Sequence, residues 1–206
     1  MVKYITSKME KNLFEIYGNK KEIPQIGIPT FDEAKKLLTQ GLRYYVGEKA
    51  IWLDEYDNIA RWLVDNHHRG LLLFGSNGVG KSVMCTKVLP VIFKYYAKMS
   101  ANTNVDLCYY TRATDIEGNY EKNLPLRYSP ILIIDDIGAE SETLHYGTKR
   151  DFIAELVDLC EEQSRLLIMT TNLSPDEISE KYGKRTLDRL HSITHAFTIE
   201  HESLRR

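Results

Sequence analysis

The chain has 206 residues, of which 43% are hydrophobic and 27% charged, a composition typical of a folded globular protein and not of a disordered one. Its formal net charge is −2, so any contact with nucleic acid must come from a local basic patch. The three cysteines, Cys85, Cys108 and Cys160, match neither a disulfide framework nor a zinc site, which favours a reducing, cytoplasmic compartment. We expect no signal peptide and no membrane partner, because every apolar run is too short to cross a bilayer.

Residues 1–48 are expected to form a short N-terminal extension, a tail plus a helix that could bind a partner, ahead of a domain spanning 49–206. The helix is predicted to start at Thr30, because Thr30 and Glu33 have the spacing of a capping box. A second amphipathic helix is predicted to begin at Ile51 and to end before the first apolar run.

Five short apolar runs follow, separated by segments with helical periodicity. The runs are Leu71–Phe74, Val105–Tyr110, Ile131–Ile134, Leu166–Thr170 and Ala196–Ile199. Each is continuously apolar, as strands buried on both faces should be. Helices are predicted over 81–98 and 149–163, and after an N-cap at Ser174. Strands that alternate with helices predict an α/β fold with a parallel sheet and right-handed crossovers.

The segment between the first run and the next helix satisfies the pattern GxxxxGK[ST]. Its residues are Gly75, Ser76, Asn77, Gly78, Val79, Gly80, Lys81 and Ser82. Glycines let successive backbone N–H groups point at phosphate oxygens, and the helix N-terminus adds its positive dipole end. Lys81 can reach the β- and γ-phosphates, and Ser82 can bind Mg²⁺. In this strand-to-helix context, the pattern predicts a site for ATP and Mg²⁺ in preference to an incidental glycine-rich turn.

Two later strand ends carry polar side chains. Asp135 and Asp136 follow the run at 131–134, and Asn172 follows the run at 166–170. Ligands of parallel sheets bind at the carboxyl ends of the strands, so Asp135 is predicted to hold Mg²⁺ through water and Asp136 to act as general base. Asn172 can orient the attacking water if the two strands are neighbours. The alternative is that these polar residues only form turns where strands end.

Arg185 and Arg189 lie four residues apart, so they share one face of a predicted helix. One of them could project into the nucleotide site of a neighbouring subunit as an arginine finger. The alternative is a solvated basic helix in which an arginine pairs with Asp188.

Taken in order, these motifs resemble those of the DnaC/IstB-like branch of the AAA+ ATPases, which includes bacterial and phage helicase loaders. The matching stretches are GLLLFGSNGVGKS, SPILIIDDIG, RLLIMTTNLSPDEI and YGKRTLDRL, within residues 50–206. The resemblance implies an AAA+ P-loop fold with a five-stranded parallel sheet in the order 5-1-4-3-2, flanked by helices. It implies that Asn172 is sensor 1 and that Arg205 is sensor 2. It also makes Arg189 the finger acting in trans, with Arg185 as the second choice.

The same resemblance implies partners and an activity. It predicts an ATP-hydrolysing enzyme of DNA replication, a helicase loader that assembles with itself and binds single-stranded DNA, with a replicative helicase as a possible partner. Three alternatives share part of the motifs. They are an IstB-like transposition helper, a P-loop kinase for a small molecule, and a nucleotide-gated binding module that does not hydrolyse ATP.

Overall fold

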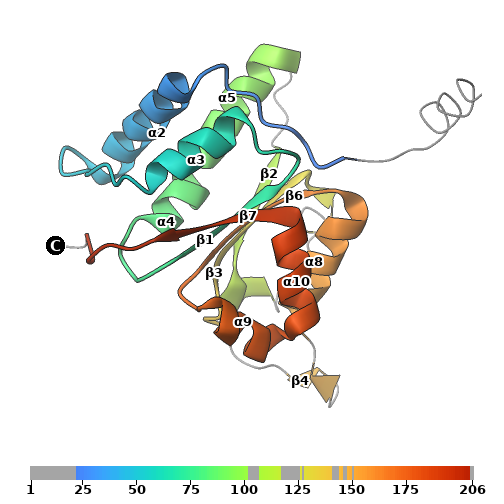
Figure 1. Cartoon of the computed structure of the whole chain (residues 1–206). Coiled ribbons are helices and arrows are strands. Elements are labelled where there is room, and N and C mark those ends of the chain that lie inside the picture. Colours follow the sequence, from blue (N-terminus) through green and yellow to red (C-terminus); the bar gives the residue numbers. More distant parts are fainter. Residues whose placement is uncertain are drawn as a thin grey trace, which may run out of the picture.

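A five-stranded parallel sheet lies between two layers of helices in the computed structural model (Figure 1). The described residues are 22–101, 107–116, 126, 128–140, 144–145, 148–149 and 151–204. The strands are β1 (Gly70–Gly75), β2 (Cys108–Arg112), β3 (Ile131–Ile137), β6 (Leu166–Thr171) and β7 (Thr194–Ile199). Neighbouring strands pair in parallel in the order β2-β3-β6-β1-β7. This order is the predicted 5-1-4-3-2 read from the opposite edge, so the predicted fold is confirmed.

The helices divide between the two faces of the sheet (Figure 1). One layer contains α2 (Phe31–Val46), α3 (Tyr56–Val64), α4 (Lys81–Val83), the π-helical turn η1 (Met84–Val88) and α5 (Leu89–Ala101). The other contains α8 (Phe152–Gln163), α9 (Pro175–Tyr182) and α10 (Lys184–Ile193). A 3₁₀ turn, η2 (Ala113–Asp115), follows β2, and the short strands β4 (Leu144–His145) and β5 (Thr148–Lys149) form an antiparallel pair. The predicted helix at 81–98 is confirmed, with a π-helical turn inside it. The helix predicted at 149–163 is present but begins only at Phe152, because Lys149 belongs to β5.

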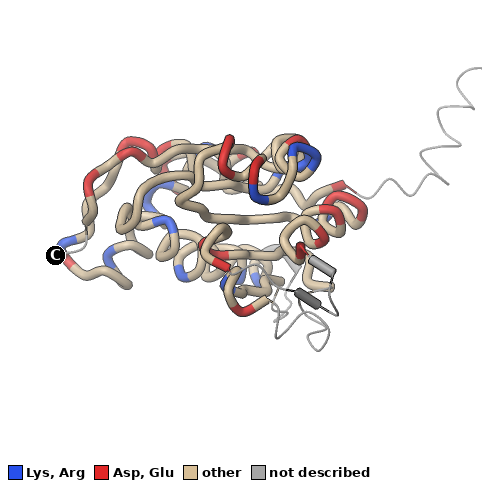
Figure 2. Tube along the Cα trace, turned by 90° about the horizontal axis from the view of Figure 1, so that it is seen from below, with Lys and Arg blue, Asp and Glu red and all other residues tan. Residues whose placement is uncertain are grey.

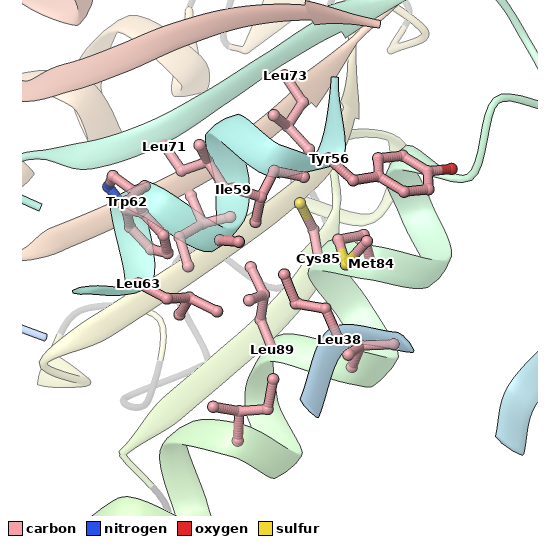
Figure 3. Close-up of a cluster of buried hydrophobic side chains, with 14 of the residues drawn as sticks. Leu38, Tyr56, Ile59, Trp62, Leu63, Leu71, Leu73, Met84, Cys85 and Leu89 are labelled. Atoms are coloured by element: carbon pink, nitrogen blue, oxygen red, sulfur yellow. The ribbon is translucent and has the colours of Figure 1, made fainter. Parts of the chain in front are cut away.

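Two hydrophobic clusters form because successive side chains of a strand point to opposite faces of the sheet. Leu71 of β1 packs with α2, α3 and α5, whereas its neighbour Leu72 packs with α8 and α10. Figure 3 shows the first cluster, where the Trp62 side chain packs among aliphatic side chains. Its indole N–H donates to the carbonyl groups of Arg69 and Gly70, so this large ring is buried without an unpaired donor.

Helix α2, which belongs to the predicted N-terminal extension, packs into the first cluster. Its buried residues Ala34, Leu38 and Leu42 contribute to the same core as α3 and the sheet. The predicted division at residue 48 stays a prediction, but α2 is not separate from the hydrophobic core.

Burial along the strands depends on their place in the sheet. The central strands β1, β3 and β6 are buried along nearly their whole length, as continuous apolar runs predict. The same expectation is wrong for β2 and β7, whose Tyr110, Ala196 and Thr198 are exposed. These two strands lie at the edges of the sheet, where the helical layers cover them incompletely.

Two strands begin at other residues than predicted. The strand expected over Val105–Tyr110 runs from Cys108 to Arg112, and Val105 lies outside the described residues. Strand β7 begins at Thr194, two residues before the expected start, because its pairing with β1 already begins there.

The helix expected from Ile51 begins only at Tyr56. Ile51 is 52% exposed, and the indole N–H of Trp52 donates to Asp57 in the first turn of α3. Lys35 of α2 donates to the same carboxylate oxygen. The segment before α3 is therefore not helical, but Trp52 bonds it to α3 and lies under the Lys35 ammonium of α2, 4.8 Å from the centre of the indole ring.

The two predicted N-caps are both present, but only one is a complete capping box. Ser174 and Glu177 form both bonds of the box. Thr30 accepts from the Glu33 N–H, whereas the Glu33 carboxylate accepts a hydrogen bond from Tyr96 of α5 at 2.5 Å. The Glu33 side chain, which the local pattern assigned to the cap, thus makes a tertiary contact instead.

Charges of both signs are interspersed along the described chain, in keeping with the small net charge (Figure 2). In the part of the chain that the structure describes, no helix is long and apolar enough to cross a membrane.

Gly70 starts β1 at a point where β6 comes too close for a side chain. A Cβ atom there would lie 1.9 Å from the Leu167 carbonyl oxygen. We expect Gly70→Ala to lower the free energy of unfolding by about 2 kcal/mol or more, because strand backbone would have to shift. Urea unfolding measures the change, with Gly27→Ala, which meets nothing within 4 Å, as the control. Equal stabilities of the two variants would contradict this account.

Candidate nucleotide-binding site

The glycine-rich loop joins the carboxyl end of β1 to the N-terminus of α4. Gly78 and Gly80 have φ angles of 88° and 86°, in the left-handed region that glycine adopts without strain. Consecutive amides in such turns form concave sites for anions, and the following helix N-terminus adds its dipole. The backbone of the predicted phosphate loop therefore has a conformation suited to phosphate.

The Lys81 side chain reaches from α4 across this loop. Its Nζ donates to the carbonyl oxygens of Gly75 at 2.7 Å and Ser76 at 2.9 Å, and to Asn172 Oδ1 at 2.9 Å. The residue is only 6% exposed. The ammonium is thus held between the loop and the end of β6, where a phosphate in the loop would meet it.

The two aspartates at the end of β3 are oriented by β6. The Thr170 hydroxyl donates to Asp135 Oδ1 at 2.6 Å and accepts from the Asp136 N–H at 2.9 Å. Asp136 has a φ of 60°, and the register of β3 with β6 shifts between Ile134 and Ile137. This irregularity interrupts the regular alternation of the strand where the two aspartates lie.

Asn172 connects the lysine to the second aspartate. Its Oδ1 accepts from Lys81, and its Nδ2 donates to Asp136 Oδ1 at 2.7 Å. The role predicted for Asn172 requires the strand before it to lie next to the strand of the two aspartates. This condition is met, because β3 and β6 are neighbours in the sheet. The structure thereby brings three of the predicted site residues, from three separate motifs, into one hydrogen-bonded chain.

The comparisons with known proteins decide the family. A family model described as "ATPase family associated with various cellular activities (AAA)" matches residues 71–194. The chain belongs to the AAA family. No curated protein sequence matches the chain.

Solved structures with a similar arrangement include the DnaC helicase loader and DnaI. The first is 21% identical with a TM-score of 0.47 and covers 64% of this chain and 78% of that chain. The second, DnaI, is 19% identical with a TM-score of 0.48 and covers 66% and 73%. A third, AMPPCP-bound DnaA from Aquifex aeolicus, is 12% identical with a TM-score of 0.47 and covers 74% and 48%. The family assignment rests on the family model and not on these structures.

Members of the AAA family bind nucleotide, and the donor atoms here suit a nucleotide with its Mg²⁺. Ser82 lies in the first turn of α4, directly after the phosphate loop, and Asp135 lies near the carboxyl end of β3, so the site offers a hydroxyl and a carboxylate. Hard oxygen ligands of this kind suit Mg²⁺, which usually takes one or two protein ligands and completes its shell with phosphate and water. Among the described residues, no group of three or more His, Cys, Asp or Glu could hold a metal alone. The site therefore fits Mg²⁺ that arrives with a nucleotide.

The segment that follows β7 packs on the phosphate loop. The Ser76 hydroxyl donates to the His201 carbonyl at 3.0 Å, and the Leu204 N–H donates to the Gly78 carbonyl at 3.1 Å. Next to it lies a cavity of about 670 Å³ between the loop, the turn after β6 and the end of β7. Arg205, the predicted sensor 2, lies outside the described residues.

The two candidate arginines both lie on α10, but in different surroundings. Arg189 forms ion pairs with Asp158 and, at 3.0 Å, with Glu161, both on α8. Arg185 is exposed. Arg189 therefore does not make the alternative pairing with Asp188. The assignment of Arg189 as the finger stays a prediction.

Tyr56 is a site residue that the motifs do not reveal. Its hydroxyl donates to the Val79 carbonyl in the phosphate loop at 2.7 Å. Burial raises the pKa of Tyr56 to about 12, so the phenol stays protonated and can donate throughout the physiological range. Nothing in the local sequence marks this tyrosine, because its partner lies 23 residues further along the chain.

Removal of this hydroxyl tests whether α3 supports the loop. In Tyr56→Phe the ring still packs, but the Val79 carbonyl loses its donor, at a cost of about 1 kcal/mol or more. We expect the affinity for a fluorescent ATP analogue to fall by about fivefold, since the loop is less well held. Tyr44→Phe, which changes an 82% exposed ring, is the control. Unchanged affinity in both variants would rule out the supporting role.

Proposed function

We propose that this AAA-family protein binds ATP with Mg²⁺ and hydrolyses it, and that it acts in DNA replication as a helicase loader. In this proposal the active form is a homo-oligomer that binds single-stranded DNA. The observation that supports hydrolysis is the hydrogen-bonded chain from Lys81 through Asn172 to Asp136. It joins a group that contacts the terminal phosphate to a carboxylate that can accept a proton from water.

Each residue of the site has a definite task in this reaction. The backbone of the loop and the Lys81 ammonium would hold the phosphates, while Ser82, and Asp135 through water, would hold Mg²⁺. When bound, Mg²⁺ neutralises phosphate charge. Asp136 accepts the proton of the attacking water, and Asn172 orients both this carboxylate and the water. Arg205 would contact the nucleotide as sensor 2.

The finger in trans is proposed to come from α10. Arg189 is the choice that the family resemblance makes, but it would have to leave Asp158 and Glu161 to reach a neighbour. Arg185 is exposed on the same helix and has no such bonds to break in the described structure. The surroundings therefore favour Arg185, and hydrolysis should depend on contact between subunits.

Two substitutions separate binding from hydrolysis. Lys81→Ala should weaken ATP binding by about 100-fold, because the loop loses its buried cation. Asp136→Asn should bind ATP with nearly wild-type affinity but lower kcat by about 100-fold or more, because an amide cannot accept the proton. Binding titrations and phosphate release measure the two effects, with the exposed Lys36→Ala as control. Normal turnover in Asp136→Asn would discard the general base.

Mixing of variant subunits tests the finger. Lys81→Ala subunits lack a working site but keep their arginines, and Arg185→Ala subunits have the reverse defect. Each variant alone should release little phosphate, and the mixture should recover activity, because one subunit supplies Arg185 to the site of the other. Arg189→Ala is tested in the same way. If Arg185→Ala alone keeps full activity and only Arg189→Ala loses it, Arg189 is the finger.

The broader role is tested by phosphate release at several protein concentrations, with and without single-stranded DNA. Activity that rises with both supports a DNA-linked assembly, and binding to a replicative helicase is then measured directly. A phosphorylated small molecule in place of free phosphate would indicate a kinase. ATP that stays bound for hours would indicate a nucleotide-gated module, and stimulation by a transposase alone would indicate a transposition helper.

A further inference from the structure

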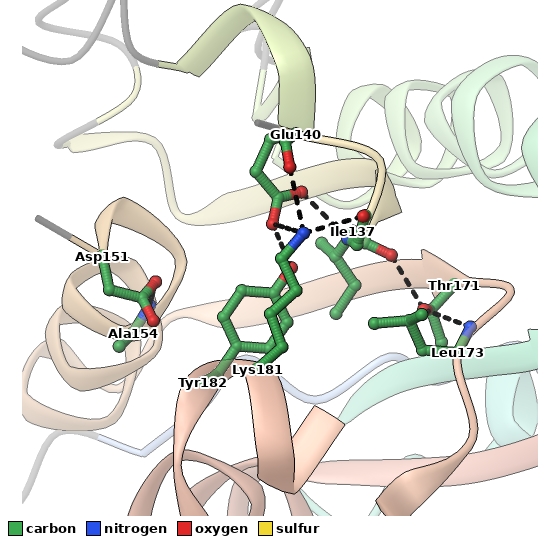
Figure 4. A network of polar contacts seen from close by, with 9 residues as sticks. Ile137, Glu140, Asp151, Ala154, Thr171, Leu173, Lys181 and Tyr182 are labelled. Atoms are coloured by element: carbon green, nitrogen blue, oxygen red, sulfur yellow. Dashed lines mark hydrogen bonds and ion pairs between the residues drawn. The ribbon is translucent and has the colours of Figure 1, made fainter. Parts of the chain in front are cut away.

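The Glu140 carboxylate lies at the centre of a polar network just beyond the Asp136 end of β3 (Figure 4). Its Oε2 accepts from the Gly138 N–H at 2.9 Å, within the loop that leaves the strand. Its Oε1 pairs with Lys181 Nζ at 3.0 Å and accepts a hydrogen bond from the Tyr182 hydroxyl. One carboxylate thus connects the end of β3 with the last two residues of α9.

Lys181 strengthens the same connection through the backbone. Besides the carboxylate, its Nζ donates to the carbonyl oxygens of Gly138 at 2.7 Å and Glu140 at 3.0 Å. Both charged side chains are largely buried, with 27% of Lys181 and 19% of Glu140 exposed. Burial and the neighbouring Glu140 carboxylate raise the pKa of Tyr182, so its hydroxyl remains a donor. The loop after β3 therefore cannot move without the end of α9 moving or these bonds breaking.

The loop is also packed tightly against the end of β6. Gly138 has a φ of 101°, and a Cβ atom on it would lie 2.6 Å from side-chain atoms of Leu173. The Thr171 hydroxyl donates to the Ile137 carbonyl at 2.8 Å and accepts from the Leu173 N–H at 3.0 Å. Helix α9 starts right after this turn, so its N-terminus is joined to the end of β6 beside Asn172. Its C-terminus is bonded to the loop after β3, just beyond Asp136.

From α9 the connection continues directly into α10. Gly183, with a φ of 87°, is the one residue between the two helices. The Thr186 hydroxyl of α10 donates to the Tyr182 carbonyl at 2.9 Å. Arg185 is the second residue of α10. The position of Tyr182 therefore determines where the arginine-bearing helix begins.

We propose that Glu140, Lys181 and Tyr182 are positioning residues that couple the occupancy of the nucleotide site to the placement of α10. Gly138 lies two residues after Asp136. When a nucleotide binds and changes the charge beside Asp136, these contacts pass the change to Glu140, then to the end of α9, and then to Arg185. The inference rests on the proposed function, since it needs a nucleotide at this site. It adds a regulated finger, offered to a neighbouring subunit according to what the site holds.

Hydrogen exchange of residues 184–193 in the full chain tests the coupling. A non-hydrolysable ATP analogue with Mg²⁺ should change the exchange rate of this helix by about threefold or more in the wild type. Glu140→Gln should bind the analogue within about twofold of the wild-type affinity, yet show no change in α10. Glu180→Gln removes the same charge from an exposed position of α9 and should respond like the wild type. Tyr182→Phe removes only the hydroxyl, and it replaces Glu140→Gln if that variant unfolds in urea too readily.

Steady-state kinetics supply the second readout. Glu140→Gln should lower kcat by about tenfold with KM within about twofold, because binding is intact and the finger is misplaced. In an Arg185→Ala background the same substitution should cause no further loss, since both changes act through one arginine. Additive losses would show that Glu140 acts by another route and would overturn the coupling.

The outcomes separate the two proposals. A wild-type chain that does not bind the analogue would refute the proposed function. If the analogue binds but α10 does not respond, or if Glu140→Gln keeps the full response, the coupling is wrong and nucleotide binding stands.

Discussion

The Asn172 side-chain amide is the contact on which the arrangement of the site depends. It accepts from Lys81 at the end of the phosphate loop and donates to Asp136 at the end of β3. This is possible only because β6 lies between β1 and β3, with all three strands parallel. The carboxyl ends then meet at one edge of the sheet, which is where ligands bind in folds of this kind. The apolar residues that bury these strands on both faces therefore also determine where the polar side chains meet.

The phosphate loop is held by contacts from outside the motif. The Tyr56 hydroxyl bonds to its Val79 carbonyl from α3, and the segment after β7 bonds to it through Ser76 and Gly78. A loop that is already ordered loses less conformational entropy when it binds phosphate, so more of the interaction energy remains for affinity. Helix α3 thus contributes to the site although it carries none of its motifs.

The opposite helical layer connects the site to the molecular surface. Helix α10 is held to α8 by the ion pairs of Arg189, and to the loop after β3 through α9, Lys181 and Glu140. Two arginines on one helix consequently have different surroundings, since Arg189 is bonded within the chain and Arg185 faces outward. Helix α10 can respond to the nucleotide site only if its contacts with α8 and its contacts with α9 change together.

The sequence by itself determined the strand runs of the sheet, the phosphate loop, the paired aspartates and Asn172, because each is a local pattern of side-chain type and spacing. It also marked both arginines, and the resemblance supplied the strand order that the pairing confirms. Only the tertiary structure decided which side chains meet. Thr170 binds Asp135, 35 positions away in the sequence, and Lys181 binds the Glu140 carbonyl, 41 positions away. Glu33 bonds to Tyr96, 63 positions away, and not to the cap of its own helix. Side-chain partners at such separations depend on which strands pair and on how helices pack on the sheet, which the spacing of residues along a chain does not encode.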